Sequence, residues 1–536
     1  MKKSFIFATM AAAALFAGCS SNDDLTSNPG GDVINPNTEQ VAIKIGVAQA
    51  VSTGMRGTGT VGGVADIGNA TDGYTAGADN IWAGQQINVY MFEKVTDANQ
   101  KLTLAKDGQN VSLYENTAMY TPGSADNKIP DMGAEAFTNF GEAMITTGKI
   151  QYWPLNGNYD FFGYHGDNAV TTVNPVQDGD IVTAYKADFT IDGSQDLMST
   201  KAAPTTDDTA LPGYDASKIY SASMARKNIQ PNLTFNHLLT RLTFNIKAGN
   251  DEAAGVKITG YKDGNGADKT IAEYNTAVAA SQDVSGWTAV KAQTNPTTDT
   301  YTGVKVSKIE ILSKKTGKML VAWIADPTDK IEWDAETTNA AYMTLKARST
   351  AAGDIYGYIK KDRSGSIITA AAWADITDAD EKASYEPFYN PNKALVDLTP
   401  IAPGYNPDGA TDDEKFIKTK VGESLIVSLP ITATVDSTDP LNEVFSDVAD
   451  NNEANEAYYI ARVTLTQKVR DNWNNDNLVD KSNSMVVKIP LPEGKPKFEI
   501  NNSYNVNLTL YGFERIIVNT TLEAWKYGGE IDVIGE

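Results

Sequence analysis

Residues 41–48 read VAIKIGVA, a stretch in which every second residue is apolar and branched. Val41, Ile43, Ile45 and Val47 alternate with Ala, Lys, Gly and Ala, and this period of two predicts a β-strand with one buried face. Burying each of the four side chains contributes about 1.5–3 kcal/mol, or about 6–12 kcal/mol together. Since a domain has only about 5–15 kcal/mol of net stability, this strand is expected to stabilise its domain strongly.

The rest of the chain carries the same signal. It is rich in Val, Ile, Thr and Tyr, and Asn, Asp and Gly separate its apolar stretches. Residues 101–114 (KLTLAKDGQNVSLY) predict a hairpin turning at Asp107-Gly108, and residues 308–323 (KIEILSKKTGKMLVAW) predict a second hairpin with a longer turn. Helical periodicity is scarce, apart from a short stretch around Asp380. The sequence therefore predicts an all-β fold built of sandwiches.

The N-terminus has the pattern of an exported lipoprotein. Lys2 and Lys3 precede an apolar run over residues 5–17 that is too short to span a bilayer, as in a secretory signal peptide. Residues 15–19 (LFAGC) resemble the bacterial lipobox, which implies cleavage after residue 18 and acylation of Cys19, the only cysteine of the chain. The alternative is a signal peptide whose cysteine merely lies near the cut. The polar residues 19–40 would then be a lipidated tether, and residues 22–24 (NDD) resemble the export tag of Bacteroidales-type surface lipoproteins.

Composition argues against several classes of function. The formal charge of −23 is spread along the chain, so no basic footprint for nucleic acid exists. Two histidines and one cysteine are too few for a Cys/His zinc site, and no GxSxG motif is present. The acidic residues 407–415 do not have EF-hand spacing and are better explained as a solvated loop. We expect no enzyme activity and no cofactor.

Residues 57–62 (GTGTVG) match the GxGxxG pattern of dinucleotide sites. Such a site also needs a helix beginning there, because the N–H groups of the helix N-terminus bind the pyrophosphate. The following residues contain four more glycines and no period of 3.6, so they do not predict that helix. An open loop with Arg56 at its front edge is the better interpretation.

Four stretches together resemble the fimbrillin family of Bacteroidales pilus subunits, in particular the minor-fimbrium or Mfa-like type. They are the lipobox and the segments QYWPLNGNYDFFGYHG (151–166), LTFNHLLTRLTFNIKA (233–248) and YNVNLTLYGFERIIVNTTLEAW (504–525). The resemblance implies a lipoprotein precursor with two tandem β-sandwich domains of transthyretin-like topology. It also implies that an arginine-specific surface protease removes the first strand, and that a strand from the C-terminal end of another subunit fills the vacated groove.

On this resemblance, residues 41–56 are a removable first strand, residues 57–228 an N-terminal domain and residues 229–536 a C-terminal domain. The expected cut lies between Arg56 and Gly57. Arg226 lies in a predicted loop and is a weaker candidate, whereas Arg241 lies in a predicted strand that a protease could not reach.

The donor strand is expected near the C-terminus. Val518 and Leu522 belong to one alternating segment, and Ile531 and Val533 continue the alternation after Gly528-Gly529. The alternative is that both segments are ordinary strands of their own domain. Head-to-tail strand addition does not close on itself, so it would build a filament from copies of this chain and other fimbrial subunits. The donor-like tail favours a stalk position over a tip position.

A second class of function shares these features. A monomeric surface glycan-binding lipoprotein would also have a lipobox, a tether and β-sandwiches. Its ligands would stack on exposed aromatic residues, for which a core or rim position is the alternative (Trp82, Trp287, Trp333 and Trp473). Trp153 and His237 are expected in the core. In the leading interpretation the precursor is held in the outer membrane by its lipid and the product is an extracellular fimbrium whose adhesion target the sequence does not identify.

Overall fold

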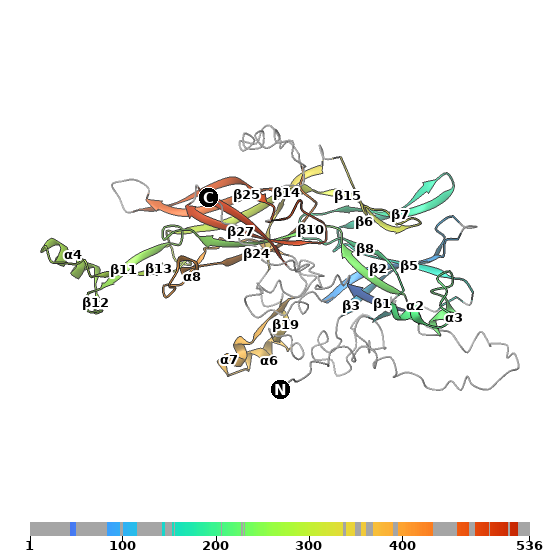
Figure 1. Ribbon diagram of the computed structural model, residues 1–536, viewed down its shortest axis with the longest axis horizontal. Coiled ribbons are helices and arrows are strands. Elements are labelled where there is room, and N and C mark those ends of the chain that lie inside the picture. Colours follow the sequence, from blue (N-terminus) through green and yellow to red (C-terminus); the bar gives the residue numbers. More distant parts are fainter. Residues whose placement is uncertain are drawn as a thin grey trace.

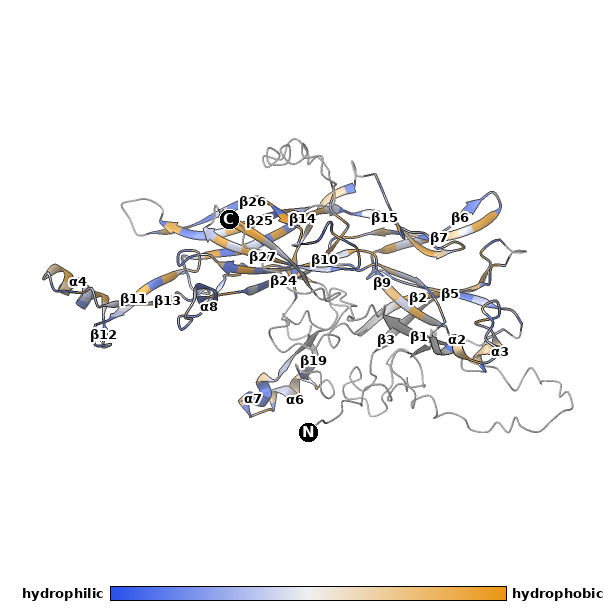
Figure 2. Cartoon of the chain, viewed as in Figure 1, coloured by the Kyte–Doolittle hydropathy of each residue, from blue (hydrophilic) through white to orange (hydrophobic). Residues whose placement is uncertain are grey.

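The computed structural model (Figure 1) describes residues 43–49, 83–96, 100–114, 142–144, 153–154, 156–204, 206–226, 229, 231–335, 339–348, 355–360, 368–389, 395–431, 458–470, 477–492, 494–512 and 515–523. Its elements are mostly strands in several sheets, with a few short helices, so the predicted all-β fold is confirmed. Hydrophobic and hydrophilic residues alternate along many strands (Figure 2). No helix in these ranges is long and apolar enough to cross a membrane.

One half of the molecule is built on a seven-stranded sheet, in the order β3-β2-β5-β8-β9-β1-β4. Its strands are β1 (Lys44–Gln49), β2 (Ala83–Glu93), β3 (Leu104–Tyr114), β4 (Glu142–Met144), β5 (Tyr159–His165), β8 (Met198–Lys201) and β9 (Asn232–His237). Facing it is a sheet of β16 (Ile331–Trp333), β15 (Thr316–Trp323), β7 (Ile181–Thr190) and β6 (Val170–Asp178). Phe92, Phe162 and Trp323 pack between the two sheets, with the rings of Phe162 and Trp323 5.0 Å apart.

The other half is a second sandwich. One sheet contains β24 (Thr419–Val427), β10 (Thr240–Ala248), β27 (Ser503–Gly512) and β28 (Arg515–Glu523), and the other contains β17 (Ala340–Thr344), β14 (Val304–Lys314), β25 (Tyr458–Arg470) and β26 (Leu478–Pro490). Leu242, Phe244 and Ile246 of β10 share one buried cluster with Val306 and Ile311 of β14. This confirms the strand expected around Arg241.

Two nearly continuous segments run from one half into the other. β14 and β15 are separated only by Lys315 and pair in different sheets, so the hairpin predicted for residues 308–323 is wrong. The side chain of buried Asn339 accepts hydrogen bonds from the backbone N–H groups of Lys315 (2.9 Å) and Thr316 (2.6 Å), and it donates to the Thr316 carbonyl (2.8 Å). Asn339 thus satisfies the backbone where the chain passes between sheets instead of reversing.

A similar set of hydrogen bonds from one asparagine lies between β9 and β10. The Asn501 side chain accepts from the backbone N–H of His237 (3.2 Å), and its own backbone N–H donates to the Leu239 carbonyl (2.9 Å). The expected division at residues 228 and 229 stays a prediction. The sheet of β6, β7, β15 and β16 takes strands from both sides of that division.

The hairpin predicted for residues 101–114 is also wrong. β3 is one strand paired with β2 along its length, and Asp107-Gly108 lie where the register shifts from Val89–Gln109 to Met91–Lys106. Asp107 and Gly108 thus lie opposite the single residue Tyr90, and this one extra residue makes a bulge, a common role of glycine inside a strand.

Two smaller units extend from the body (Figure 1). The first, which we call the arm, comprises residues 256–293 with β11 (Val256–Lys262), β12 (Asp268–Lys269), α4 (Ile271–Ala279) and β13 (Thr288–Gln293). The second contains β19 (Ile355–Lys360), α6 (Ala370–Ala374), α7 (Ala379–Ala383) and β20 (Tyr385–Tyr389), of which α7 confirms the helix expected near Asp380. The remaining elements are short: α2 (Thr206–Ala210), α3 (Ala222–Ala225), β18 (Lys346–Ala347), β21 (Val396–Asp397), β22 (Gly404–Tyr405), α8 (Asp412–Lys415) and β23 (Phe416–Ile417).

Candidate functional site

The first described strand is an internal member of the seven-stranded sheet. β1 lies between β9 and β4. It pairs in parallel with β9, from Gly46 beside Asn232 to Gln49 beside Phe235, and antiparallel with β4, where Ile45 faces Ala143. Both partners follow β1 by many residues in the sequence, so each ladder that β1 makes with a described strand is with chain beyond residue 141.

Ile43 shows how this segment enters the core. Its side chain is 1% exposed and belongs to a buried cluster with Val89, Phe161 and Leu233. Trp153 lies in the same cluster, 5% exposed, with its ring 5.4 Å from that of Phe161, so its predicted core position is confirmed. The backbone of Ile45 and Val47 lies in β1, two and four residues beyond Ile43.

β4 depends on β1 for its place in the sheet. Among the described strands, β1 is the one hydrogen-bonded neighbour of β4, whereas β9 also pairs with β8. Loss of β1 would therefore remove the pairing of β4 and leave one edge of β9 without a ladder. An unpaired edge of this kind is a template for another strand.

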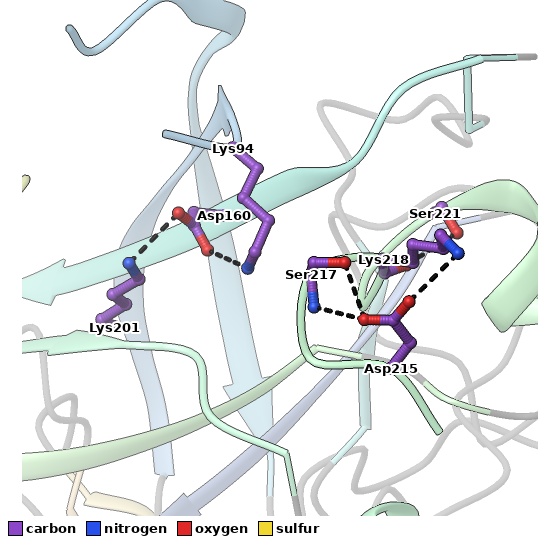
Figure 3. A network of polar contacts seen from close by, with 7 residues as sticks. All are labelled: Lys94, Asp160, Lys201, Asp215, Ser217, Lys218 and Ser221. Carbon is purple, nitrogen blue, oxygen red and sulfur yellow. Dashed lines mark hydrogen bonds and ion pairs between the residues drawn. The ribbon is translucent and has the colours of Figure 1, made fainter. Parts of the chain in front are cut away.

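The segment around α3 covers the same buried cluster. Ile219, Tyr220 and Met224 belong to it, and the Tyr159 backbone N–H donates to the Tyr220 carbonyl (3.0 Å). Asp215 fixes the preceding turn by accepting hydrogen bonds from Ser217 (Figure 3), and these bonds together with Lys218 lower the pKa of Asp215 to about 2.

The strands on the far side of the sheet are tied together independently of β1. Asp160 of β5 is 4% exposed, and its two oxygens lie 3.2 Å from Lys94 Nζ and 3.1 Å from Lys201 Nζ (Figure 3). Lys94 directly follows β2, and Lys201 ends β8. This carboxylate therefore joins β2, β5 and β8 without any contribution from the first strand.

Both histidines lie at the ends of strands that flank β8, near the second sandwich. His165 ends β5 and His237 ends β9, and each is paired across β8 to Met198. His237 Nδ1 lies 2.5 Å from Asp196 Oδ2, and His165 Nε2 lies 2.8 Å from Asp167 Oδ1. The core position expected for His237 is confirmed. Burial raises the pKa of Asp196, against the opposing effect of His237. The aspartates were not predicted, since nothing in the sequence marks two acids among 68.

Several predicted residues lie outside the described part of the chain. They are Cys19, Val41, Arg56, Gly57, Ile531 and Val533, together with Trp82, Trp473 and residues 524–536. The two other arginines considered for cleavage are described. Arg226 is exposed at the C-terminal cap of α3, and Arg241 is 6% exposed within β10, as expected for a strand position.

Val518 and Leu522 belong to β28, an edge strand. β28 forms an antiparallel hairpin with β27, with Val518 beside Leu508 and Leu522 beside Tyr504. Val518 packs against the main core, and Thr520 is 1% exposed. In this structure the segment up to Glu523 is a strand of its own sandwich.

No protein-family model and no curated protein matches the sequence. Several solved structures resemble the chain, among them the following three. A "putative cell adhesion protein" from Bacteroides uniformis has a TM-score of 0.33 at 11% identity and covers 92% of this chain and 100% of its own. Another from Bacteroides eggerthii has a TM-score of 0.29 at 10% identity, covering 91% and 96%. The fimbrial anchor protein Mfa2 from Porphyromonas gingivalis has a TM-score of 0.27 at 6% identity, covering 90% and 97%. Similarity at this level carries no argument about function.

Proposed function

We propose that this chain is a structural subunit of a cell-surface fimbrium, exported as a lipidated precursor and assembled by replacement of its first strand. In the proposal Cys19 carries the lipid and residues 41–56 leave after cleavage between Arg56 and Gly57. A strand from another copy then takes the place of β1, and repetition of this step builds a filament that supports adhesion.

The observation that carries the proposal is the position of β1. It lies inside a sheet and brings Ile43 into the core, yet both of its partner strands come from beyond residue 141. The 33 residues between Gln49 and Ala83 include Arg56. One cut there would leave β1 attached to the rest of the protein only by hydrogen bonds and packing.

The remaining strands support the idea that the protein survives this loss. β2, β5 and β8 keep their ladders and the Lys94–Asp160–Lys201 contacts, and β9 keeps β8. What would be lost is the Ile43 side chain and both ladders of β1, one with β9 and one with β4. Exposed apolar surface and an unpaired edge together favour the addition of a new strand.

The tail after β28 is the simplest donor. β28 is fully paired with β27 and part of its surface is buried, so its use as a donor would break its own sandwich. Ile531 and Val533 lie beyond it in sequence and alternate as a strand would. We therefore propose residues 524–536 as the donor. Val518 and Leu522 would stay in β28, the strand from which the tail continues.

Limited digestion of the purified precursor with an arginine-specific protease tests this function. We expect one early cut after Arg56, followed by ladders of high mass on unboiled gels. Arg56→Gln should prevent both, whereas the matched control Arg226→Gln should change neither. A precursor that is cut after Arg56 and remains a single copy would contradict the assembly step.

A monomeric glycan-binding lipoprotein is the second candidate, and the observation that favours it is a cleft on the arm. This second function predicts that the protein remains a stable monomer after digestion. The cleft is compatible with either function and is considered next.

A further inference from the structure

The arm carries an open cleft at its outer end. The cleft has a volume of about 540 Å³ and is lined by residues of the β11–β12 turn, α4 and the loop before β13, including Asp263, Asn265, Lys269, Glu273, Gln282 and Trp287. Figure 1 shows α4 and β12 at one end of the long axis, with β1 toward the other half. The cleft is thus separate from the first-strand region.

The base of the arm is fixed to the body. Gln293 at the end of β13 donates from Nε2 to the carbonyls of Ala254 and Pro403, both at 2.8 Å. Lys291 forms an ion pair with Asp251, and Asn250 donates to the Tyr511 carbonyl (3.1 Å). These contacts at the start and end of the arm hold the cleft away from the two sandwiches.

Aromatic rings form the inner wall of the arm. The rings of Tyr261 and Tyr274 stack at 3.8 Å and 7°, which ties α4 to β11. Trp287 meets both at an interplanar angle of 58°, 5.7 Å from Tyr274 and 6.5 Å from Tyr261. Neither tyrosine covers an indole face by parallel stacking. Trp287 is partly buried and contributes to the cleft.

Two charged groups of the cleft are held in place by their neighbours. Asp263 accepts from the backbone N–H groups of Asn265 and Ala267, both at 3.0 Å, and lies 3.7 Å from Lys269 Nζ. Glu273 accepts from the backbone and hydroxyl of Thr270 in the capping box of α4. These bonds lower the pKa of both carboxyl groups, so both remain ionised acceptors at neutral pH.

Two other polar side chains of the cleft have no hydrogen-bond partner among the described residues. Within the described residues, the side-chain amides of Asn265 and Gln282 make no hydrogen bond, although each offers donors and acceptors. The wall therefore presents planar amides and carboxylates around one indole, over small residues such as Gly264, Ala272 and Ala277.

We propose that this cleft is a binding site for a neutral carbohydrate. A sugar ring has an apolar C–H face that can lie on an indole, and a rim of hydroxyl groups that both donate and accept hydrogen bonds. The amides, the carboxylates and the lysine of the cleft can form hydrogen bonds with those hydroxyl groups. The two carboxylates outnumber the single Lys269, so a neutral sugar fits better than an anionic one. The cleft is open, so we expect a weak site whose effect grows when many copies are displayed together.

Binding by the uncut monomer tests the site independently of assembly. Lactose, maltotriose and mannotriose are the neutral probes, 3′-sialyllactose is the anionic probe, and an unstructured peptide is the protein-like probe, each followed by saturation-transfer NMR and calorimetry. We expect saturable binding of at least one neutral probe. Trp287→Ala should weaken it about tenfold or more, and Gln282→Ala about threefold, by loss of one or two hydrogen bonds.

Trp373→Ala is the matched control, because Trp373 is a partly buried tryptophan of the second unit, stacked on Tyr358 at 4.1 Å. It should leave binding unchanged. Gln282→Ala removes a side chain that makes no hydrogen bond to another described residue, so it tests the site even if Trp287→Ala disturbs the arm. The proposal would be overturned if no neutral sugar binds, or if both cleft variants bind it as tightly as wild type does. Preferential binding of 3′-sialyllactose or of the peptide would overturn it as well. Polymer formation by the same protein is a separate readout, so failure of one proposal does not decide the other.

Discussion

Val47 of β1 lies beside Leu233 of β9 in parallel register. Leu233 is fully buried, and β9 also pairs with β8 on its other side. Removal of β1 would consequently expose one edge of a strand that is otherwise anchored in the sheet. Leu233 is the first residue of the segment 233–248 that resembles fimbrillins. That segment therefore includes most of β9, the parallel neighbour of the first strand.

The cut precursor should retain its first strand until that strand is displaced. With the covalent link after Arg56 broken, we expect residues 19–56 to co-purify with the rest of the protein and to be released by mild denaturant. Release should increase the fluorescence of a dye that binds exposed apolar surface, because the buried cluster around Phe161 and Leu233 loses Ile43. Mass spectrometry of the bound and released fractions measures this, and spontaneous release without a change in dye binding would contradict it.

Ile43→Ala should destabilise the precursor. Truncation of a fully buried isoleucine costs about 2–5 kcal/mol, including the cavity that it leaves. The matched control is Ile258→Ala on β11, since Ile258 is 41% exposed and its truncation should change stability by about 0.5 kcal/mol or less. Urea unfolding of the uncut proteins gives both values. Equal midpoints for Ile43→Ala and wild type would show that the first strand adds little.

Much of the strand content could be predicted from local alternation, but the pairing could not. Residues 308–323 alternate as two strands, yet the chain continues between sheets because Asn339, distant in sequence, satisfies the backbone at Lys315 and Thr316. Asp107-Gly108 has turn chemistry and lies in a bulge. Partner choice depends on nonlocal packing, which a local pattern does not contain.

The candidate site was predicted only in part, for the same reason. The strand around Ile43 could be recognised from its alternation. Its parallel partner β9 and its edge partner β4 could not, since about 90–190 residues separate them from β1 and no local signal specifies parallel pairing. The arm cleft combines a turn, a helix and a loop, so Trp287 could be identified only as a possible sugar platform.

Glu423 should make the second sandwich sensitive to acid. Arg348 Nε and Nη2 each lie 3.1 Å from a Glu423 oxygen, and the two side chains are 11% and 15% exposed. Burial alone would raise the pKa of Glu423, but Lys420, Arg348 and Arg241 outweigh it and hold the pKa below its usual 4.5. A lowered pKa means that the stabilisation is complete above pH 4.5 and is lost as the pH falls through the folded-state value.

Glu423→Gln should therefore lower the free energy of unfolding by about 3 kcal/mol at neutral pH, and the difference from wild type should shrink as the pH falls below 4.5. Asp268→Asn is the control, because the Lys262–Asp268 pair is exposed on the arm and is worth about 1 kcal/mol or less. The urea midpoints of both variants and wild type, measured from neutral pH downward, test this prediction. If the loss of stability caused by Glu423→Gln grew as the pH falls, the inferred direction of the Glu423 pKa shift would be wrong.

The tail and β28 should respond differently to substitution. Ile531→Asp, or deletion of residues 526–536, is expected to abolish high-mass ladders while the monomer unfolds at the same urea concentration as wild type. Val518→Asp should instead destabilise the monomer, because Val518 packs on the core beside β27. Ladders that persist after deletion of the tail would exclude residues 526–536 as the donor.

Replacement of the first strand is tested most directly by the N-terminal residue of the protein sheared from the bacterial surface, together with the mass of the sheared particles. We expect this material to begin at Gly57 and to sediment as polymers. Surface material that begins at acylated Cys19 and sediments as single copies would contradict it.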